Sequence, residues 1–278
     1  IRDMKPNTPI LALTATATPD VVNDIQEKLH FETKNVFKMS FERKNLAYIV
    51  RTVGDKINEM VHILRCTEGS AIVYARSRKR TKEIAEILNK NGETALFYHA
   101  GLDSSVKDER QKAWQSDEAR IMVATNAFGM GIDKPDIRFV IHYNIPKSIE
   151  NYYQETGRAG RDGMEGKCIL YYSHKDVSKL EHLMRDKPLN EREVGAQLIH
   201  ETVSYAESSV CRRKTLLYYF GEEYNDTKSC GQCDNCLHPK EKVEAKDEAV
   251  TVLKVIAALG EQFAIEYVML ILTGKATT

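Results

Sequence analysis

The chain has 278 residues, of which 42% are hydrophobic and 29% are charged, and its 40 Lys and Arg residues are balanced by 40 Asp and Glu residues. This composition is that of a folded globular protein, so it excludes a disordered, fibrous or strongly basic chain, and no apolar run approaches the roughly 20 residues that span a bilayer. The length permits more than one compact unit, and because the first residue is Ile1 rather than Met we expect a longer parent chain.

Residues 1–38 carry one strand-like run and one helix signal. Ile10–Leu13 is a short apolar run typical of a strand, and the following sequence predicts a helix with Thr18 as its cap and Pro19 in its first turn. One strand and one helix cannot bury a core by themselves. We therefore interpret residues 1–38 as the end of a preceding domain.

In residues 39–186, apolar β-rich runs alternate with segments of helical spacing, such as the face formed by Ile84, Ile87 and Leu88. This alternation predicts an α/β domain with a doubly wound parallel sheet. The predicted strands are residues 71–75, 94–98, 120–125, 138–143 and 167–172. Ligands of such sheets gather beyond the carboxyl ends of the strands, so the residues that follow these runs are candidates for a site.

After residue 186 the strand pattern stops. A helical pattern runs through Glu191–Glu207, and a cysteine-rich segment ends near residue 238. The polar residues 239–247 look like a linker, and Ala249–Leu259 is predicted to be a final helix. Residues 187–238 and 239–278 are therefore expected to be two further parts.

Four cysteines in the third part have the spacing of a metal site: Cys211, Cys230, Cys233 and Cys236. Four thiolates form a tetrahedral set suited to structural Zn²⁺, because they leave no coordination position open. Disulfides are the alternative. They fit poorly with the lack of a secretion signal and with two isolated cysteines, Cys66 and Cys168, which we interpret as ordinary buried residues.

Arginines dominate the remaining candidates. The run Gly157–Arg161 holds two guanidinium groups three positions apart, which at a helix start could point the same way toward a phosphate. The alternative is a pair of surface arginines in salt bridges. Two further basic clusters, residues 76–80 and 212–214, could contact phosphates or could simply be solvated surface.

Longer runs around these residues resemble the motifs of superfamily 2 helicases, and their residues are those typical of the RecQ family. Leu13–Pro19 resembles motif III, Tyr74–Arg78 and Tyr98–Leu102 resemble motif IV and the motif after it, and Ala124–Pro135 and Gln154–Gly163 resemble motifs V and VI. The cysteine-rich segment resembles the RecQ zinc-binding subdomain. The motifs follow the order of the family, and the resemblance covers nearly the whole chain.

The resemblance implies an ATP-dependent 3′-to-5′ DNA helicase of DNA repair and recombination, located in the bacterial cytoplasm or the eukaryotic nucleus. Residues 1–38 would end the first RecA-like motor domain, and residues 39–186 would form the second. Residues 187–238 would form the helical zinc-binding subdomain, and residues 239–278 a linker and the start of a winged helix. The expected partners are single-stranded DNA and duplex junctions, with no membrane.

The resemblance also implies roles for single residues. Arg158 and Arg161 would be catalytic and would reach the triphosphate across a cleft, while Gln154 and Asp133 would also belong to the nucleotide side. The implied DNA contacts are Ser77, Arg78, His99, Gly101 and Thr125. For Ser77 and Arg78 a helix cap and a solvated arginine are the alternatives.

The sequence contains no Gly-x-x-x-x-Gly-Lys-Ser/Thr phosphate loop. ATP and Mg²⁺ are therefore expected to bind only when the other motor domain supplies that loop, and the 278 residues alone should be inactive. One alternative is a non-catalytic, zinc-stapled DNA-binding or regulatory module that shares the fold. A helicase that acts on RNA is another, although the zinc subdomain argues against it.

Overall fold

The structure is a computed structural model that describes residues 8–33, 35–129, 132–185, 187–224, 229–241 and 243–275. The chain divides into two compact units, Ile1–Pro239 and Lys240–Thr278. The four-part division stays a prediction, and its expected boundary at Asp186 lies outside the described residues. Among the described helices, none combines the length and the apolar character needed to cross a membrane.

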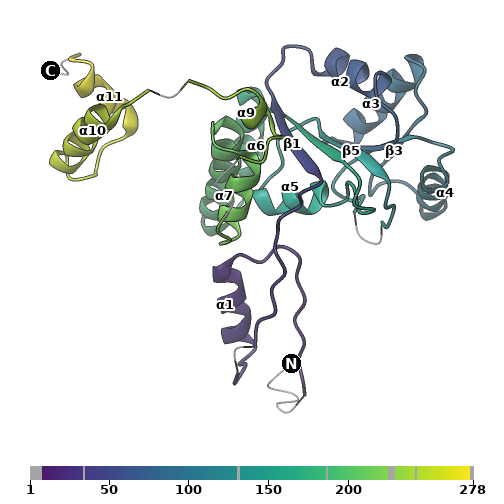
Figure 1. Cartoon of the computed structure of the whole chain (residues 1–278), viewed down its shortest axis with the longest axis horizontal. Coiled ribbons are helices and arrows are strands. Elements are labelled where there is room, and N and C mark those ends of the chain that lie inside the picture. The colour runs from purple at the N-terminus through teal and green to yellow at the C-terminus, as the bar shows by residue number, and fades with distance from the viewer. Residues whose placement is uncertain are drawn as a thin grey trace. The chain divides into compact units, whose positions relative to one another are not determined.

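A six-stranded sheet forms the centre of the first unit, with the order β1-β6-β5-β2-β4-β3 and every neighbouring pair parallel (Figure 1). The strands are β1 (Leu46–Arg51), β2 (Ser70–Tyr74), β3 (Ala95–Tyr98), β4 (Ile121–Ala124), β5 (Ile137–His142) and β6 (Gly166–Tyr171). The predicted fold class is confirmed. The five predicted strands match β2 to β6 to within one residue at each end, whereas β1 was not predicted.

Helices cover both faces of this sheet. On one face, α2 (Lys56–Arg65) and α3 (Arg78–Lys90) contribute Met60, Leu64, Ile84 and Leu88 to a fully buried cluster. The other face packs against α4 (Ser104–Gln115) through Trp114 and against α5 (Ile149–Thr156). Because both faces are covered, every residue of β2 and β4 is buried, as expected for central parallel strands.

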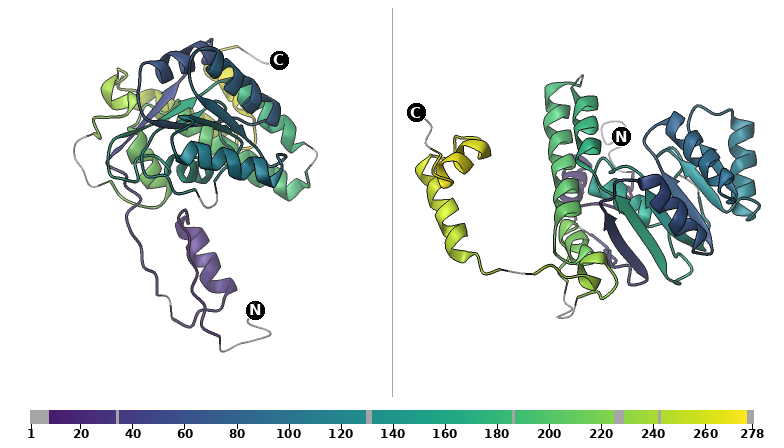
Figure 2. Two further views of the ribbon diagram at one scale, coloured as in Figure 1. Left: turned by 90° about the vertical axis from the view of Figure 1, so that its right-hand side faces the viewer. Right: turned by 90° about the horizontal axis from the view of Figure 1, so that it is seen from above.

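The cysteine-rich part of the first unit is helical, as predicted. Helices α6 (His174–Met184) and α7 (Leu189–Glu207) lie side by side (Figure 2). They are followed by α8 (Arg212–Tyr219) and by the single turn α9 (Asp234–Leu237). Both α8 and α9 contact β1, so this helical part lies against the edge of the sheet.

One of the two N-terminal predictions is confirmed and the other is wrong. Helix α1 (Pro19–Lys28) begins as predicted, with the Thr18 hydroxyl accepting a hydrogen bond from the backbone of Val21. Ile10–Leu13 is not a strand, and the side chains of Leu11 and Leu13 are 80% and 84% exposed. A strand needs a neighbour for its backbone N–H and C=O groups, and no described strand lies beside this run.

The second unit contains two described helices, α10 (Lys246–Ala258) and α11 (Ile265–Leu272). The prediction that the helix near residues 249–259 would be the last is therefore wrong. Gly260, with φ of 64°, ends the first helix, and the apolar run that forms α11 has no polar face to reveal helical spacing. The winged helix expected here stays a prediction.

Candidate functional site

Three neighbouring strands deliver the expected DNA-contacting residues to one edge of the sheet. In the order β2-β4-β3, the strands end at Tyr74, Ala124 and Tyr98. The side chains in question follow directly: Ser77 and Arg78 after β2, Thr125 after β4, and His99 and Gly101 after β3. Because the strands are parallel, their carboxyl ends meet, as the sequence predicted.

Ser77 and Arg78 behave differently from one another. Ser77 caps α3, since its hydroxyl accepts a hydrogen bond from the backbone N–H of Arg80 at 3.1 Å, and this is the alternative that the sequence left open. The guanidinium of Arg78 instead packs on Gly101, where a Cβ would meet its Nη1 at 2.6 Å. Glycine at position 101 therefore leaves room for the arginine.

A shallow basin of about 430 Å³ lies beside this pair and is lined by Arg78, Lys82 and His99 among others. Burial lowers the pKa of His99, and the neighbouring charges of Arg78 and Arg110 lower it further. The basin is also lined by Lys79 and by the acidic Glu83 and Glu86, so its charge is mixed, with Arg78 as its basic group beside Gly101. Thr125 is only 9% exposed, so its side chain is largely covered in this structure.

The arginine loop, Gly157–Arg161, follows the carboxyl end of α5 and does not begin a helix, so that part of the prediction is wrong. Gly157 is the C-cap of α5, and Gly160 turns the backbone with φ of 55°. A Cβ at Gly160 would approach Asn45 Nδ2 and the Met164 carbonyl oxygen to 2.5 Å. The turn therefore requires glycine there, and it stops the chain from entering a helix.

Both arginines of the loop point to the segment that follows β4. The guanidinium of Arg158 lies 2.8 Å from where a Cβ of Gly129 would stand, and its buried Nε has no hydrogen-bond partner in the described structure. Arg161 donates to the Ile132 carbonyl at 3.1 Å and to Asp133 Oδ1 at 3.0 Å. The salt-bridge alternative thus describes Arg161, which is 38% exposed, but not Arg158.

Gln154, which lies in α5, connects two of the sequence motifs. Its Nε2 donates to the hydroxyl of Thr16 at 2.7 Å. Thr16 belongs to the Leu13–Pro19 run, while Gln154 opens the motif that contains the arginine loop. Two runs that are 138 residues apart in sequence are therefore joined by one hydrogen bond.

Sequence reasoning missed two residues that hold the arginine loop, Arg43 and Asn45. The Arg43 guanidinium donates to the carbonyl oxygens of Gly157, Ala159 and Gly160 at 3.3, 2.9 and 3.2 Å. Asn45 Nδ2 donates to the Gly160 and Met164 carbonyl oxygens at 2.7 and 2.8 Å. Both belong to Ser40–Asn45, here called the linking segment, and their only sequence signal is polarity just before the β1 run.

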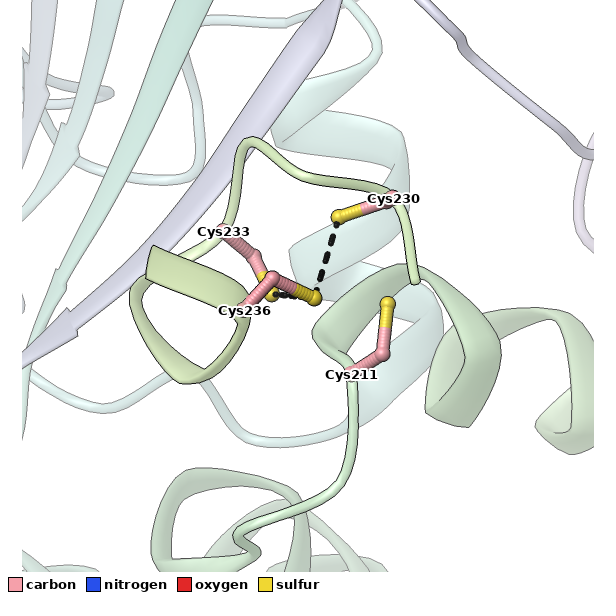
Figure 3. Close-up of side chains that lie close together, drawn as sticks. All are labelled: Cys211, Cys230, Cys233 and Cys236. Atoms are coloured by element: carbon pink, nitrogen blue, oxygen red, sulfur yellow. Dashed lines mark hydrogen bonds between the residues drawn. The ribbon is translucent and has the colours of Figure 1, made fainter. Parts of the chain in front are cut away.

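The four predicted cysteines come together in the helical part of the first unit (Figure 3). Cys211 caps α8, Cys233 caps α9, Cys236 lies within α9, and Cys230 lies in the loop before it. Their Sγ atoms all lie within 4.8 Å of one another, and Cys236 is 3.3 Å from Cys233 and 3.7 Å from Cys230. All six cysteines of the chain are free, so the disulfide alternative is wrong.

The chemistry of this cluster fits a divalent metal. Hydrogen bonds with the thiols of Cys230 and Cys233 lower the pKa of Cys211, while hydrogen bonds with Cys211 and Cys230 raise the pKa of Cys233. Four adjacent thiols cannot all ionise unless a cation balances their charge, and Zn²⁺ does so in a tetrahedral site. Cys168 is buried as predicted, but Cys66 is exposed because it follows the last turn of α2.

In the basic run after the first cysteine, Arg212 and Arg213 are 4% and 6% exposed, so they are neither solvated nor free for phosphate, whereas Lys214 is half-buried. Arg212 pairs with both carboxylate oxygens of Asp234 at 3.0 and 2.9 Å, and Asp234 also accepts from the Val50 backbone of β1 at 3.2 Å. Arg213 donates to the Leu46 carbonyl at 3.3 Å. These arginines therefore fasten the cysteine cluster to the edge strand.

Two known families match separate parts of the first unit. Residues 55–163 match the family described as "Helicase conserved C-terminal domain", and residues 174–237 match the family described as "RecQ zinc-binding". The first match covers β2 to β5 of the sheet and the arginine loop, and leaves out β1 and β6. The second covers the helical part and all four clustered cysteines.

Individual relatives are similar to this chain over nearly its whole length. The "ATP-dependent DNA helicase RecQ" of Pasteurella multocida is 40% identical over 97% of this chain and 43% of the relative, and that of Bacillus subtilis is 39% identical over 99% and 46%. The chain thus spans less than half the length of these relatives. A solved structure, S. cerevisiae Dbp5 bound to RNA and ADP BeF3, matches 68% of this chain and 54% of its own with a TM-score of 0.51 at 17% identity, a likeness of fold alone.

Proposed function

Because this chain belongs to the RecQ helicase family, we propose that it forms the second motor domain and the zinc-binding subdomain of an ATP-dependent 3′-to-5′ DNA helicase of DNA repair and recombination. The observation that carries the proposal is the convergence of the arginine loop with Asp133 and of Gln154 with Thr16. Residues 1–38 would belong to the first motor domain and residues 239–278 to a linker and the start of a winged helix.

On the nucleotide side, we propose that Arg158 and Arg161 bind oxygens of the ATP triphosphate, whose Mg²⁺ neutralises charge during phosphoryl transfer. A planar guanidinium donates two parallel hydrogen bonds to phosphate oxygens and keeps its charge. In support of this role, the Nε of Arg158 has no hydrogen-bond partner among the residues that the structure describes. Arg161 and Asp133 form an exposed pair, which a stronger anionic partner can displace at little cost.

On the DNA side, we propose that Ser77, Arg78, His99, Gly101 and Thr125 form a surface that contacts the phosphate backbone of single-stranded DNA and of duplex junctions. Arg78 supplies positive charge beside Gly101, and the His99 ring, whose pKa is lowered, offers a neutral imidazole for hydrogen bonding. The four cysteines hold one Zn²⁺ ion, which keeps the helical part folded against β1. The ion takes no part in the reaction, because four thiolates complete its coordination.

The proposal predicts unwinding by the natural full-length protein. With ATP and Mg²⁺ it should unwind a duplex that carries a 3′ single-stranded DNA tail and leave the 5′-tailed duplex intact. The 278-residue chain alone should hydrolyse no ATP, because it lacks a phosphate loop. A strand-separation assay measures the unwinding, and an ATP-turnover assay measures hydrolysis by the 278-residue chain. Zinc-dependent DNA binding without any hydrolysis would favour the non-catalytic module, and equal unwinding of an RNA duplex would favour the RNA helicase.

The DNA surface gives a second prediction. Arg78→Ala should weaken binding of single-stranded DNA for all sequences alike and reduce the slope of log K against log salt by about 0.7, the value for one lost phosphate contact on a single strand. Fluorescence anisotropy at several salt concentrations measures the slope. Arg80→Ala is the matched control, because Arg80 is held by Glu83 at 2.9 Å and by the Tyr143 hydroxyl. Equal slopes for Arg78→Ala and the parent would remove Arg78 from the interface.

A further inference from the structure

We infer that the linking segment positions the arginine loop, with Arg43 as the positioning residue, and that the zinc-binding subdomain holds the segment in place. The inference rests on the proposed function, because it gives the segment a part in ATP turnover. It assigns roles to residues that lie outside the resemblance motifs. The contacts form a continuous chain from the cysteine cluster to Arg158.

The first link is between Arg43 and the arginine loop. One guanidinium donates to three carbonyl oxygens, those of Gly157, Ala159 and Gly160. These carbonyls flank Arg158 in sequence, so they fix the backbone from which its side chain projects. Because the five N–H donors of arginine lie in one plane, the three contacts determine the orientation of the loop as well as its distance.

The second link is between the linking segment and the residues that end α8. Glu222 accepts hydrogen bonds from the Ser40 hydroxyl and, at 2.8 Å, from the backbone N–H of Phe41. The ring of Phe41 stacks on Phe220 with centroids 4.5 Å apart and an interplanar angle of 15°. Phe220 is the C-cap of α8, the helix that begins at Cys211. The segment is therefore attached to the subdomain that the cysteines organise.

The third link is between the linking segment and Tyr153 of α5. The Tyr153 hydroxyl donates to the Phe41 carbonyl at 2.7 Å, and its ring packs on both Phe41 and Phe220 with centroids 5.8 and 4.8 Å apart. Tyr153 directly precedes Gln154 and the arginine loop. A shift of α8 would therefore move Phe41, and with it Arg43 and the carbonyls that Arg43 holds. Misplacement of a catalytic group by about 1 Å can cost 10²-fold in rate, so small shifts would matter.

The test compares Arg43→Lys with Arg120→Lys. Arg120 is a matched control because it too donates to three carbonyls near the end of a helix, those of Leu64, Thr67 and Gly69, and none of these acceptors belongs to the arginine loop. Lysine keeps the charge but cannot form the planar fork. Both variants should lose thermal stability, whereas only Arg43→Lys should lower kcat for DNA-stimulated ATP hydrolysis, by at least about fivefold, since it alone misplaces a reacting group.

Two further readouts separate positioning from stability. The dissociation constant for ATP should stay within about twofold, because a positioning residue acts on turnover rather than on binding. In the 278-residue chain without nucleotide, amide hydrogen exchange in residues 153–165 should be about tenfold faster in Arg43→Lys and unchanged in Arg120→Lys. Equal kcat values in the two variants, or unchanged exchange in Arg43→Lys, would overturn the inference.

The attachment to the zinc-binding subdomain is tested by Glu222→Ala, with Glu223→Ala as the control one residue along the chain. Glu222→Ala should accelerate the same amide exchange and lower kcat while zinc content is retained, and Glu223→Ala, whose side chain is exposed, should change neither. Unchanged exchange in both would disconnect the subdomain from the loop. The exchange experiment needs no ATP turnover, so a natural protein without ATPase activity would refute the proposed function and leave the positioning role to be decided separately.

Discussion

Arg158→Ala and Arg161→Ala in the natural full-length protein should each reduce DNA-stimulated ATP turnover by at least about tenfold. Arginine fingers contribute about 10³ to 10⁵ in rate, which sets the upper end of the expected loss. ATP affinity should change far less. The reason is that a guanidinium which reaches the triphosphate chiefly stabilises charge that develops during phosphoryl transfer. A loss of such an interaction appears in kcat rather than in binding.

The structure ranks the two arginines. Arg158 lies beside the buried Tyr74 and forms no ion pair among the described residues, whereas Arg161 already pairs with the exposed Asp133, so Arg158→Ala should have the larger effect. Lysine should rescue little at either position, because a point charge on a flexible stem does not reproduce a two-pronged contact.

Steady-state ATPase rates with saturating single-stranded DNA, nucleotide affinity and melting temperature are the measurements that decide between a catalytic and a surface role. Arg51→Ala is the matched control, since Arg51 forms an ordinary surface pair with Glu59 at 3.2 Å. Near-normal turnover in both loop variants would show that these arginines are surface salt-bridge residues.

Cys233→Ser should abolish zinc binding and unfold the helical part around the cluster. Structural zinc contributes about 10 to 16 kcal/mol of apparent binding energy in small modules, far more than packing alone supplies to a single-turn helix such as α9. Cys233 is the most buried ligand, with 1% exposure, and it also accepts a hydrogen bond from the Arg212 backbone at 3.4 Å. Its loss should therefore break the pair of Arg212 with Asp234 and release Asp234 from Val50 of β1.

Elemental analysis of protein purified without chelator should give one zinc ion per parent chain and none in Cys233→Ser, and far-ultraviolet circular dichroism should show the accompanying loss of helix. Cys66→Ser is the control, because Cys66 is exposed and outside the cluster. A parent protein free of zinc, or a Cys233→Ser variant with full zinc and an unchanged melting temperature, would contradict the assignment.

The sequence predicted five of the six strands, including β3 at one edge, and missed β1 at the other edge. Strands β2, β4 and β5 are buried on both faces, so they appear as continuous apolar runs with turn residues at each end. Strand β1 lies at the edge, alternates buried with half-buried residues and finds its partner β6 far along the chain. Ile10–Leu13 shows the opposite error, since an apolar run forms no strand without a neighbour.

At the site, spacing predicted the cysteine cluster because its three C-terminal ligands are local, and only Cys211 comes from elsewhere. Spacing could not predict the carbonyl contacts of Arg43, because a backbone acceptor leaves no mark in sequence. The same is true of Arg212 and Arg213, which as a basic run looked like surface. Burial of an arginine depends on partners such as Asp234, which lies 22 residues away.

The position of β1 has a consequence for synthesis on the ribosome. It is made before the other five strands of the sheet, yet among the described strands it pairs with β6 alone, and its other side is covered by Arg213 and Asp234, which are 167 and 184 residues beyond their contacts on Leu46 and Val50. At about 5 to 20 residues per second, β1 waits on the order of ten seconds or more for its last contact. A nascent chain that stalls before β6 therefore presents an unpaired apolar strand, the kind of edge that recruits strands from other chains.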